Sequence, residues 1–327
     1  MKKTMLVGII AAVLAAVAWS LGFIAPFVIG NYSLFDFTLV EFVFSGFLGV
    51  GLLWKNAQTV RKLKLGDWIA ACSLGVIGYV GYYLAVMGAA VYAGPVIAPA
   101  FLGLVPVVLA IAGNFRERTV SWRALALPLC IVTVGLLLVN GSGFAQSSPL
   151  EMRSLLIGIP LAVLAVALWT LFGLLNQSAL AKRPQMDAIV WAALIMVGAG
   201  LAMLVFAPIG LWAGLFEFPR LGLRWDVAGP LIIWGAVLAI FTNLGGAMAW
   251  TFASQRLPVA LSAQLITMEP TSATVLGLFV HHRWPSVAEV LGMIVLLTGV
   301  VIAIGTFARS MNDAAEPRTW VPTGNSR

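Results

Sequence analysis

The sequence predicts an all-α polytopic membrane protein with ten transmembrane helices, arranged as two inverted five-helix repeats. Three observations support this prediction: an apolar composition, ten apolar runs long enough to cross a bilayer, and a pattern that recurs in the second half of the chain. Of the 327 residues, 61% are hydrophobic and only 9% are charged, and the mean hydropathy is +1.02. Soluble domains carry about 25% charged residues, so most of this apolar surface is expected to face lipid.

The ten apolar runs follow one another along the whole chain. The first run begins after Met1-Lys2-Lys3 and resembles a signal peptide, with Ala16-Val17-Ala18 as an apparent cleavage site. We expect it to be retained as a helix, because it is too long for a signal core and an internal copy of it occurs later. The predicted spans are 6–30, 37–54, 69–91, 95–113, 124–140, 155–176, 188–212, 229–250, 258–280 and 287–308.

Lysine and arginine residues are distributed unevenly between the two sets of loops. With the N-terminus in the cytoplasm, all but four of the 19 fall on the cytoplasmic side; the four are Arg153, Arg220, Arg224 and Arg283. This asymmetry predicts a multi-pass protein of the inner or plasma membrane with both termini cytoplasmic. The tail 309–327 is expected to be disordered, and no contiguous basic face indicates nucleic-acid binding.

An internal repeat relates the two halves of the chain. Residues 12–20 read AVLAAVAWS and residues 162–170 read AVLAVALWT. The repeat predicts one five-helix unit over 1–150 and a second over 151–308. Because five is odd, the second unit enters the membrane from the opposite side, an arrangement that suits alternating access to a site near the midplane.

Two stripes of small residues occur at corresponding places in the third and eighth spans. Such stripes let helices approach closely, either to slide or to pack statically. The first stripe is Gly78, Gly81, Ala85 and Gly88, and the second is Ala239, Thr242, Gly246 and Ala249.

Several short motifs appear in an order that resembles the drug/metabolite transporter superfamily, in particular its ten-span EamA-type permeases. The resemblance extends over about residues 8–308. It implies a helical permease of two repeats that moves small organic solutes, often outward, through a cavity between the repeats. The motifs are Trp19-Ser20, Trp169, Leu104-Val105-Pro106, Arg116-Glu117-Arg118, Glu269-Pro270 and Trp284-Pro285-Ser286.

The chain departs from the family pattern in two places. The basic residue common near the start of the second span is absent, and Leu39-Val40-Glu41-Phe42 stands there. The acidic residue usual after the ninth span is replaced by His281-His282-Arg283, although Glu117 supplies its first-half counterpart. The first departure bears on the charge of the substrate.

Glu269 is the leading candidate for function. It lies near the middle of an apolar stretch, Pro258 to His282, and is followed by Pro270. A carboxylate at bilayer depth costs roughly 2.5–3.5 kcal/mol, and a proline interrupts the backbone hydrogen bonds. We expect Glu269 to contact the solute and to couple transport to protons; the alternative is a neutral, structural glutamate. The corresponding first-half position is Val105, so the carboxylate belongs to one half only.

Aromatic and polar side chains inside the spans are candidates for the solute-binding site. Trp19 and Trp169 are related by the repeat and can hold an ammonium group by cation–π contact or simply pack. Tyr79 and Tyr83 share one helical face. The remaining candidates for a polar lining at the midplane are Tyr82, Thr242, Asn243 and Gln264.

Four other titratable residues are expected to lie at the membrane interface or at a helix start, without a role in transport. Glu41 can line an external vestibule or lie at the interface, and we favour the interface. Glu289 begins the tenth span, where it suits a helix N-terminus. His281 and His282 are adjacent, which is poor spacing for a shared metal ion, so we expect an interfacial position without function.

The sequence also excludes several functions. No lysine or arginine is assigned to the middle of a span, which disfavours anionic substrates. No Walker A motif indicates ATP coupling, and no nucleophile–base constellation indicates an enzyme. Cys72 and Cys130 form no disulfide or metal pattern, and no cofactor is predicted.

The predicted function is therefore secondary transport. The favoured solutes are amino acids or related neutral or cationic metabolites; export follows from the family resemblance, with proton coupling or facilitated diffusion both open. The expected partners are a small-molecule solute and the lipid bilayer, and the oligomeric state is open. One alternative is uptake of a quaternary amine such as choline through an aromatic cage on Trp19 and Trp169. An alternative of another class is a lipid-carrier flippase or a structural membrane subunit.

Overall fold

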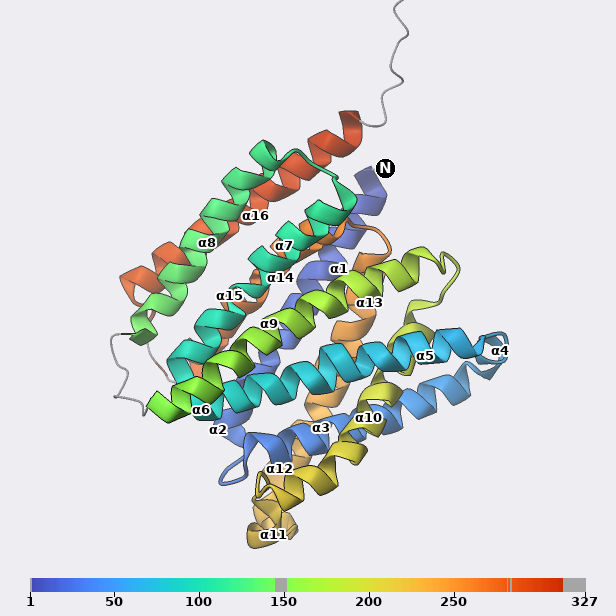
Figure 1. Ribbon diagram of the computed structural model, residues 1–327, viewed down its shortest axis with the longest axis vertical. Helices are drawn as coiled ribbons and strands as arrows, with labels where there is room; N and C mark the ends of the chain where they lie inside the picture. The colour runs from blue at the N-terminus through green and yellow to red at the C-terminus, as the bar shows by residue number, and fades with distance from the viewer. Residues whose placement is uncertain (1, 145–151, 281, 283, 314–327) are drawn as a thin grey trace, which may run out of the picture.

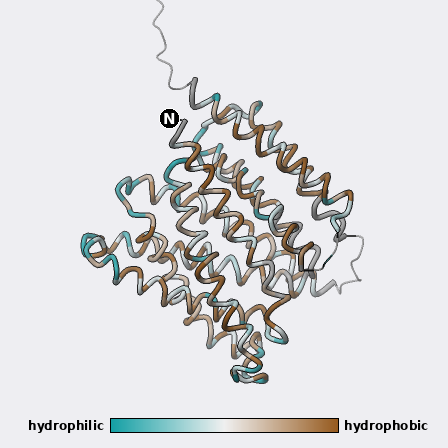
Figure 2. The backbone as a smooth tube through the Cα atoms, turned by 180° about the vertical axis from the view of Figure 1, so that it is seen from behind, coloured by the Kyte–Doolittle hydropathy of each residue, from teal (hydrophilic) through white to brown (hydrophobic). Residues whose placement is uncertain are grey.

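The computed structural model describes residues 2–144, 152–280, 282 and 284–313, and within them every regular element is a helix. Most helices slant across the molecule, α1, α12 and α13 run more steeply and cross several of the others, and elements from both halves of the chain interleave (Figure 1). Apolar residues cover the helices along their length, whereas hydrophilic residues gather at several of the connections (Figure 2). This distribution is that of a bundle whose flanks face an apolar medium.

The first half contains ten elements. Asp36 and Ser33 form a capping box that starts α3, and Pro106 lies in the first turn of α7, where its missing N–H costs no hydrogen bond. The elements are α1 (Lys2–Ser20), η1 (Leu21–Ile24), α2 (Ala25–Val28), α3 (Leu34–Lys55), α4 (Ala57–Val60), α5 (Leu65–Leu74), η2 (Gly75–Gly81), α6 (Tyr82–Leu102), α7 (Val105–Glu117) and α8 (Trp122–Phe144).

The second half contains nine elements. Asp187 starts α10 by accepting hydrogen bonds from the backbone N–H groups of Ile189 and Val190. The elements are α9 (Met152–Ala181), α10 (Ala188–Trp212), α11 (Phe218–Leu221), α12 (Trp225–Leu238), η3 (Ala239–Gly246), α13 (Ala247–Ser254), α14 (Val259–Ile266), α15 (Met268–Val280) and α16 (Val287–Asp313).

Six helical stretches of the described residues are long and apolar enough to cross a membrane, and 4–20 and 122–138 are shorter apolar helices. The all-helical membrane class is therefore confirmed, although six is fewer than the ten spans predicted. One predicted boundary was wrong. The third and fourth spans were separated at 91–95, but α6 continues through Pro95 and the break falls at Gly103 and Leu104. Pro106 explains the shift, because it suits the first turn of a new helix.

The most extensive packing joins elements of one half to elements of the other. α3 packs against α10, α7 against α14, α8 against α16, α6 against α9, and α1 against η3 and α13. In Figure 1, α8 and α16 lie together on one side of the bundle, and α3 and α10 lie toward the opposite side.

Two segments of π-helix, η2 and η3, interrupt the third and eighth predicted spans. π-Helical turns are rare and are frequent at functional sites. Each one brings a glycine of a predicted small-residue stripe against an aromatic ring: Gly78 against Phe172 and Gly246 against Trp19. A Cβ atom at position 246 would lie 2.5 Å from the Nε1 atom of Trp19. The stripes therefore let η2 approach α9 and η3 approach α1.

Candidate functional site

A continuous cluster of aromatic side chains occupies the interior of the bundle. Its members come from α1, α3, η2, α6, α9 and α13, and neighbouring ring centroids lie 4.9–6.2 Å apart. We call these residues the aromatic cluster. They are Trp19, Phe42, Tyr79, Tyr82, Tyr83, Trp169, Phe172 and Trp250.

The two repeat-related tryptophans lie at the centre of one half of this cluster. Trp19 meets Trp169 edge to face, with centroids 5.1 Å apart and planes at 85°, and it also contacts Trp250 at 5.6 Å. Both Trp19 and Trp169 are buried. The structure thus brings these two predicted residues together, with their rings packed on other rings.

The tyrosines of η2 and α6 form the other half of the cluster. Tyr82 contacts Trp169 with centroids 4.9 Å apart, and Tyr83 contacts Phe42 at 5.2 Å. Tyr79 is buried between Phe42 and Phe172. Tyr82 and Tyr83 are only partly buried, so these two side chains keep part of their surface exposed.

Glu269 lies in the first turn of α15, directly after the break between α14 and α15 at Thr267. Its carboxylate is close enough to interact electrostatically with Tyr82 and Tyr83. The residue is half-buried, and within the described residues no hydrogen bond or ion pair reaches it. A carboxylate without a protein partner beside partly exposed tyrosines can bind a cationic group or a proton.

Glu41 is a second interior carboxylate, and its predicted interfacial position was wrong. Only 1% of the residue is exposed. Its Oε1 atom accepts a hydrogen bond from Nδ2 of Asn243 at 3.0 Å and lies 3.2 Å from Oγ1 of Thr242. The burial arises because η3 packs against α3, bringing residues 41 and 243 together. The signal that could have found Glu41 was its place inside an apolar run, which is the argument that singled out Glu269.

The remaining predicted residues fall in two places. Asn243 contacts Glu41, whose carboxylate also interacts electrostatically with Tyr79 and Tyr83. Gln264 is buried in α14, and its amide atoms have no partner within the described residues. Within the described residues, the Gln264 side chain makes no hydrogen bond to the aromatic cluster.

At one end of the bundle, residues 32–36 hold the connection between α10 and α12. The buried carboxylate of Asp36 accepts hydrogen bonds from the backbone N–H groups of Glu217, at 3.0 Å, and Phe218, at 3.2 Å. Tyr32 donates to the carbonyl oxygen of Gly222 at 2.7 Å. Burial, followed by the neighbouring Asp36 and Asp226, raises the pKa of Tyr32. We call this set the α11-end clamp; sequence reasoning missed it.

At the opposite end, other contacts join the two halves. Nε of Arg183 lies 2.6 Å from Oδ1 of Asp67. Glu117 accepts a hydrogen bond at 3.0 Å from the backbone N–H of Val259, the first residue of α14. Burial raises the pKa of Glu117, although the Val259 hydrogen bond and Arg116 oppose this shift. Both ends of the bundle are therefore tied between the halves in this conformation.

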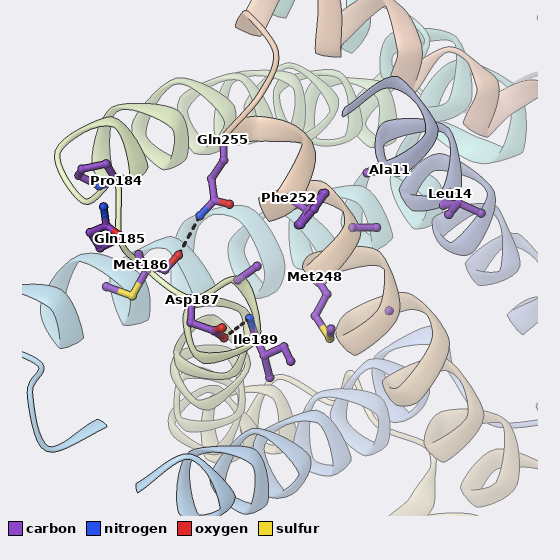
Figure 3. A pocket seen from close by; sticks show the side chains of 13 residues that line it. Ala11, Leu14, Pro184, Gln185, Met186, Asp187, Ile189, Met248, Phe252 and Gln255 are labelled. Carbon is purple, nitrogen blue, oxygen red and sulfur yellow. Dashed lines mark hydrogen bonds between the residues drawn. The ribbon is translucent and has the colours of Figure 1, made fainter. Parts of the chain in front are cut away.

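A crevice of about 720 Å³ lies between α1, the start of α10 and α13. Figure 3 shows the apolar side chains Leu14 and Phe252 on two helices that flank it, with the polar groups Gln255 at the end of α13 and Asp187 just before α10. Gly245 also lines the crevice, and the next residue contacts Trp19 of the aromatic cluster. The crevice therefore ends near the cluster.

The residues Glu289, His281 and His282, for which the sequence predicted structural roles, lie around the start of α16 in the sequence. Glu289 accepts a hydrogen bond from the backbone N–H of Ser286, and Oγ of Ser286 accepts one from the Glu289 N–H, so the predicted helix-start role is confirmed. His282 is exposed with a φ of 49°, and His281 lies outside the described residues.

Comparison with known proteins assigns the fold and the family. The model of the EamA-like transporter family matches residues 6–141 and 156–305, which confirms the resemblance predicted from the motifs. The inner membrane protein YtfF of Escherichia coli strain K12 is 25% identical over 308 residues, which cover 92% of this chain and 95% of YtfF. One crystal structure matches with a TM-score of 0.68 and 19% identity, over 92% of this chain and 98% of that chain, and shows likeness of fold.

Proposed function

This chain belongs to the EamA-like transporter family and is a multi-pass membrane transporter of small solutes, and from that premise we propose that it exports amino acids or related neutral or cationic metabolites by alternating access. The single observation that carries the choice of solute is the Glu269 carboxylate. It has no protein partner within the described residues and lies beside the partly exposed Tyr82 and Tyr83. Carboxylate and aromatic faces together suit an ammonium group.

The proposed architecture is ten spans in two inverted repeats, over 1–150 and 151–308, with both termini in the cytoplasm. The packing between the halves supports it. A two-fold relation exchanges each span with the span five places away. The contacts of α1 with η3 and α13 then become the contacts of α9 with η2 and α6. The pairs α3–α10, α7–α14 and α8–α16 are each exchanged with themselves. Such self-complementary pairing is what a two-fold relation produces.

Glu269 is proposed to exchange a proton for the cationic group of the solute. The tied ends of the bundle support alternating access, because the α11-end clamp and the Asp67–Arg183 ion pair each join one half to the other. Opening either end requires one set of contacts to break while the other holds. Facilitated diffusion is the outcome if Glu269 binds the solute without releasing a proton.

Thermal stabilisation of the purified protein by a panel of amino acids and quaternary amines, choline included, tests the proposal. A solute that binds only the folded protein raises the melting temperature, with about 2.7 kcal/mol of stabilisation at a hundredfold excess over Kd. The shift is expected to disappear in Glu269→Gln and to persist in Glu217→Gln, a matched change at the α11 end. A panel that gives no shift, or an equal shift in Glu269→Gln, refutes the assignment.

Trp19 distinguishes export of metabolites from the quaternary-amine alternative. If choline alone stabilises the protein and Trp19→Phe weakens the effect, the aromatic cage is favoured, because phenylalanine is a weaker cation–π partner than tryptophan. Trp212 is 90% exposed at the end of α10 and provides the control variant Trp212→Phe. An equal response in both variants rejects the cage.

The crevice supports a second candidate function, a lipid-carrier flippase. Leu14, on its wall, is 59% exposed on the apolar flank of α1, so the crevice borders the lipid phase. A lipid carrier held there would co-purify and be detected by native mass spectrometry. Its absence, together with stabilisation by an amine, rejects the flippase.

A further inference from the structure

Glu41 lies at the seam between the two halves of the chain. It belongs to α3, and its hydrogen-bonding neighbours Thr242 and Asn243 belong to the π-helical segment η3. On the third side, the backbone of α12 comes close enough that a Cβ atom at Gly235 would lie 3.4 Å from the Glu41 nitrogen. A change in the charge of this carboxyl group would therefore act on both halves.

One hydroxyl hydrogen beside Glu41 has two acceptors. The hydroxyl of Thr242 carries a single hydrogen, yet its Oγ1 atom is within hydrogen-bond distance of both Oε1 of Glu41 and the carbonyl oxygen of Leu238. A hydrogen on Oε1 of Glu41 would let the carboxyl group donate to Thr242 while Thr242 donates to Leu238. Oε2 of Glu41 is buried and has no partner within the described residues, so an ionised carboxylate would leave a charged oxygen buried and uncompensated.

The charges around Glu41 favour its neutral form. Tyr79 and Tyr83 face it from η2 and α6, and η3 contributes the neutral Thr242 and Asn243. The helices α2, α4 and α10 carry no charged residue, and Asp226 of α12 pairs with Arg224. On α3 itself, Asp36 belongs to the α11-end clamp, and Lys55 lies in the last turn, far along the helix.

We propose that Glu41 is a proton-binding site at the seam between the halves, separate from the solute site at Glu269. An ionised carboxylate buried without a cation is costly and takes up a proton instead. The bound proton lies on Oε1, directed at Oγ1 of Thr242 3.2 Å away. The carboxyl group is buried, which suits a ligand as small as a proton.

The site deepens the proposed transport function and rests on it for its role. When the proton leaves, the ionised Oε1 attracts the single hydrogen of Thr242 away from the carbonyl oxygen of Leu238, at the junction of α12 and η3. Loss of the proton would thus alter η3, which also carries Gly246 against Trp19. Proton binding at Glu41 would in this way be linked to the packing of α1 on η3.

Infrared difference spectroscopy of the protein in lipid, without any solute, tests the site directly. At about pH 7, where an unperturbed glutamate is ionised, the wild type is expected to show the C=O band of a protonated carboxyl group. Glu41→Gln should remove the component of this band that belongs to Glu41, in the wild type and in a Glu269→Gln background alike. Glu217→Gln, at an exposed ion pair with Arg220, is the matched change that should leave the band in place. A spectrum of Glu41→Gln with an unchanged carboxylic acid band would show that Glu41 is ionised and overturn the proposal.

A second variant protects the test against misfolding. Thr242→Val removes a hydroxyl next to Oε1 and should shift the frequency of the Glu41 band; an unshifted band overturns the proposal. Glutamine also mimics the protonated acid, so Glu41→Gln should melt within a few degrees of the wild type, whereas a large drop argues for an ionised Glu41. Because the spectra need no solute, the band can be present while the amine screen fails, and each proposal can fail alone.

Discussion

Replacement of Asp36 by asparagine is expected to release the connection between α10 and α12 from the start of α3. Four donors converge on this carboxylate: the backbone N–H and hydroxyl of Ser33 and the backbone N–H groups of Glu217 and Phe218. Asparagine keeps one acceptor oxygen and directs an amide donor at the remaining donors.

The magnitude follows from the number of hydrogen bonds lost. A hydrogen bond to a charged group contributes about 1.5–3 kcal/mol, and loss of two at the lower figure gives about 3 kcal/mol. With about 2.1 cal/mol/K of unfolding entropy per residue, 1 kcal/mol corresponds to roughly 1.5 °C in melting temperature for a chain of 327 residues. Asp36→Asn should therefore lower the melting temperature by roughly 4–5 °C.

Thermal melting and hydrogen exchange together check this prediction. Exchange should rise in residues 213–224 of Asp36→Asn and stay low in α8 and α16, on the opposite side of the bundle. Asp226→Asn is the matched control, because Asp226 is exposed and pairs with Arg224, and such exposed pairs contribute little. Equal melting temperatures for the two variants would refute the clamp.

Three other predictions concern the α11-end clamp, the small-residue stripe of the eighth span and the start of α14. The pKa of Tyr32 is raised in the folded protein, so the tyrosine's contribution to stability is complete below about pH 10 and is lost as the pH rises through the folded pKa. Tyr32→Phe should therefore flatten the alkaline side of a plot of melting temperature against pH. An unchanged plot contradicts the assignment. Gly246→Ala should cost about 1–3 kcal/mol by forcing Trp19 to move, and Gly51→Ala, with open space around it, should be neutral or stabilising in the same melting assay. Glu117→Ala should lose about 1 kcal/mol by uncapping α14, whereas Glu117→Gln keeps an acceptor oxygen and should melt close to wild type; equal losses argue against a capping role.

Local patterns were sufficient for the class of protein and the positions of most helices. Helical stretches cover the predicted apolar runs wherever the chain is described, because a backbone in lipid must satisfy its own hydrogen bonds and a helix does so locally. The recurrence of a tryptophan in the two halves led to Trp19 and Trp169, which the structure places in contact. The boundary after α6 was misjudged because two prolines, Pro95 and Pro106, compete as helix starts.

The local pattern was sufficient for the apolar, helical character of this chain and for its family, and it led to the prediction of Glu269. Which other charges belong to the interior depends on the packing of distant helices. Glu41 and Asn243 are 202 residues apart, and Asp36 and Phe218 are 182 residues apart. Periodicity reports which face of a helix is apolar, but a partner on a distant helix leaves no mark in the local pattern. For that reason the packing of α3 against η3, and not the sequence around position 41, turns a glutamate predicted at the interface into a buried proton-site candidate.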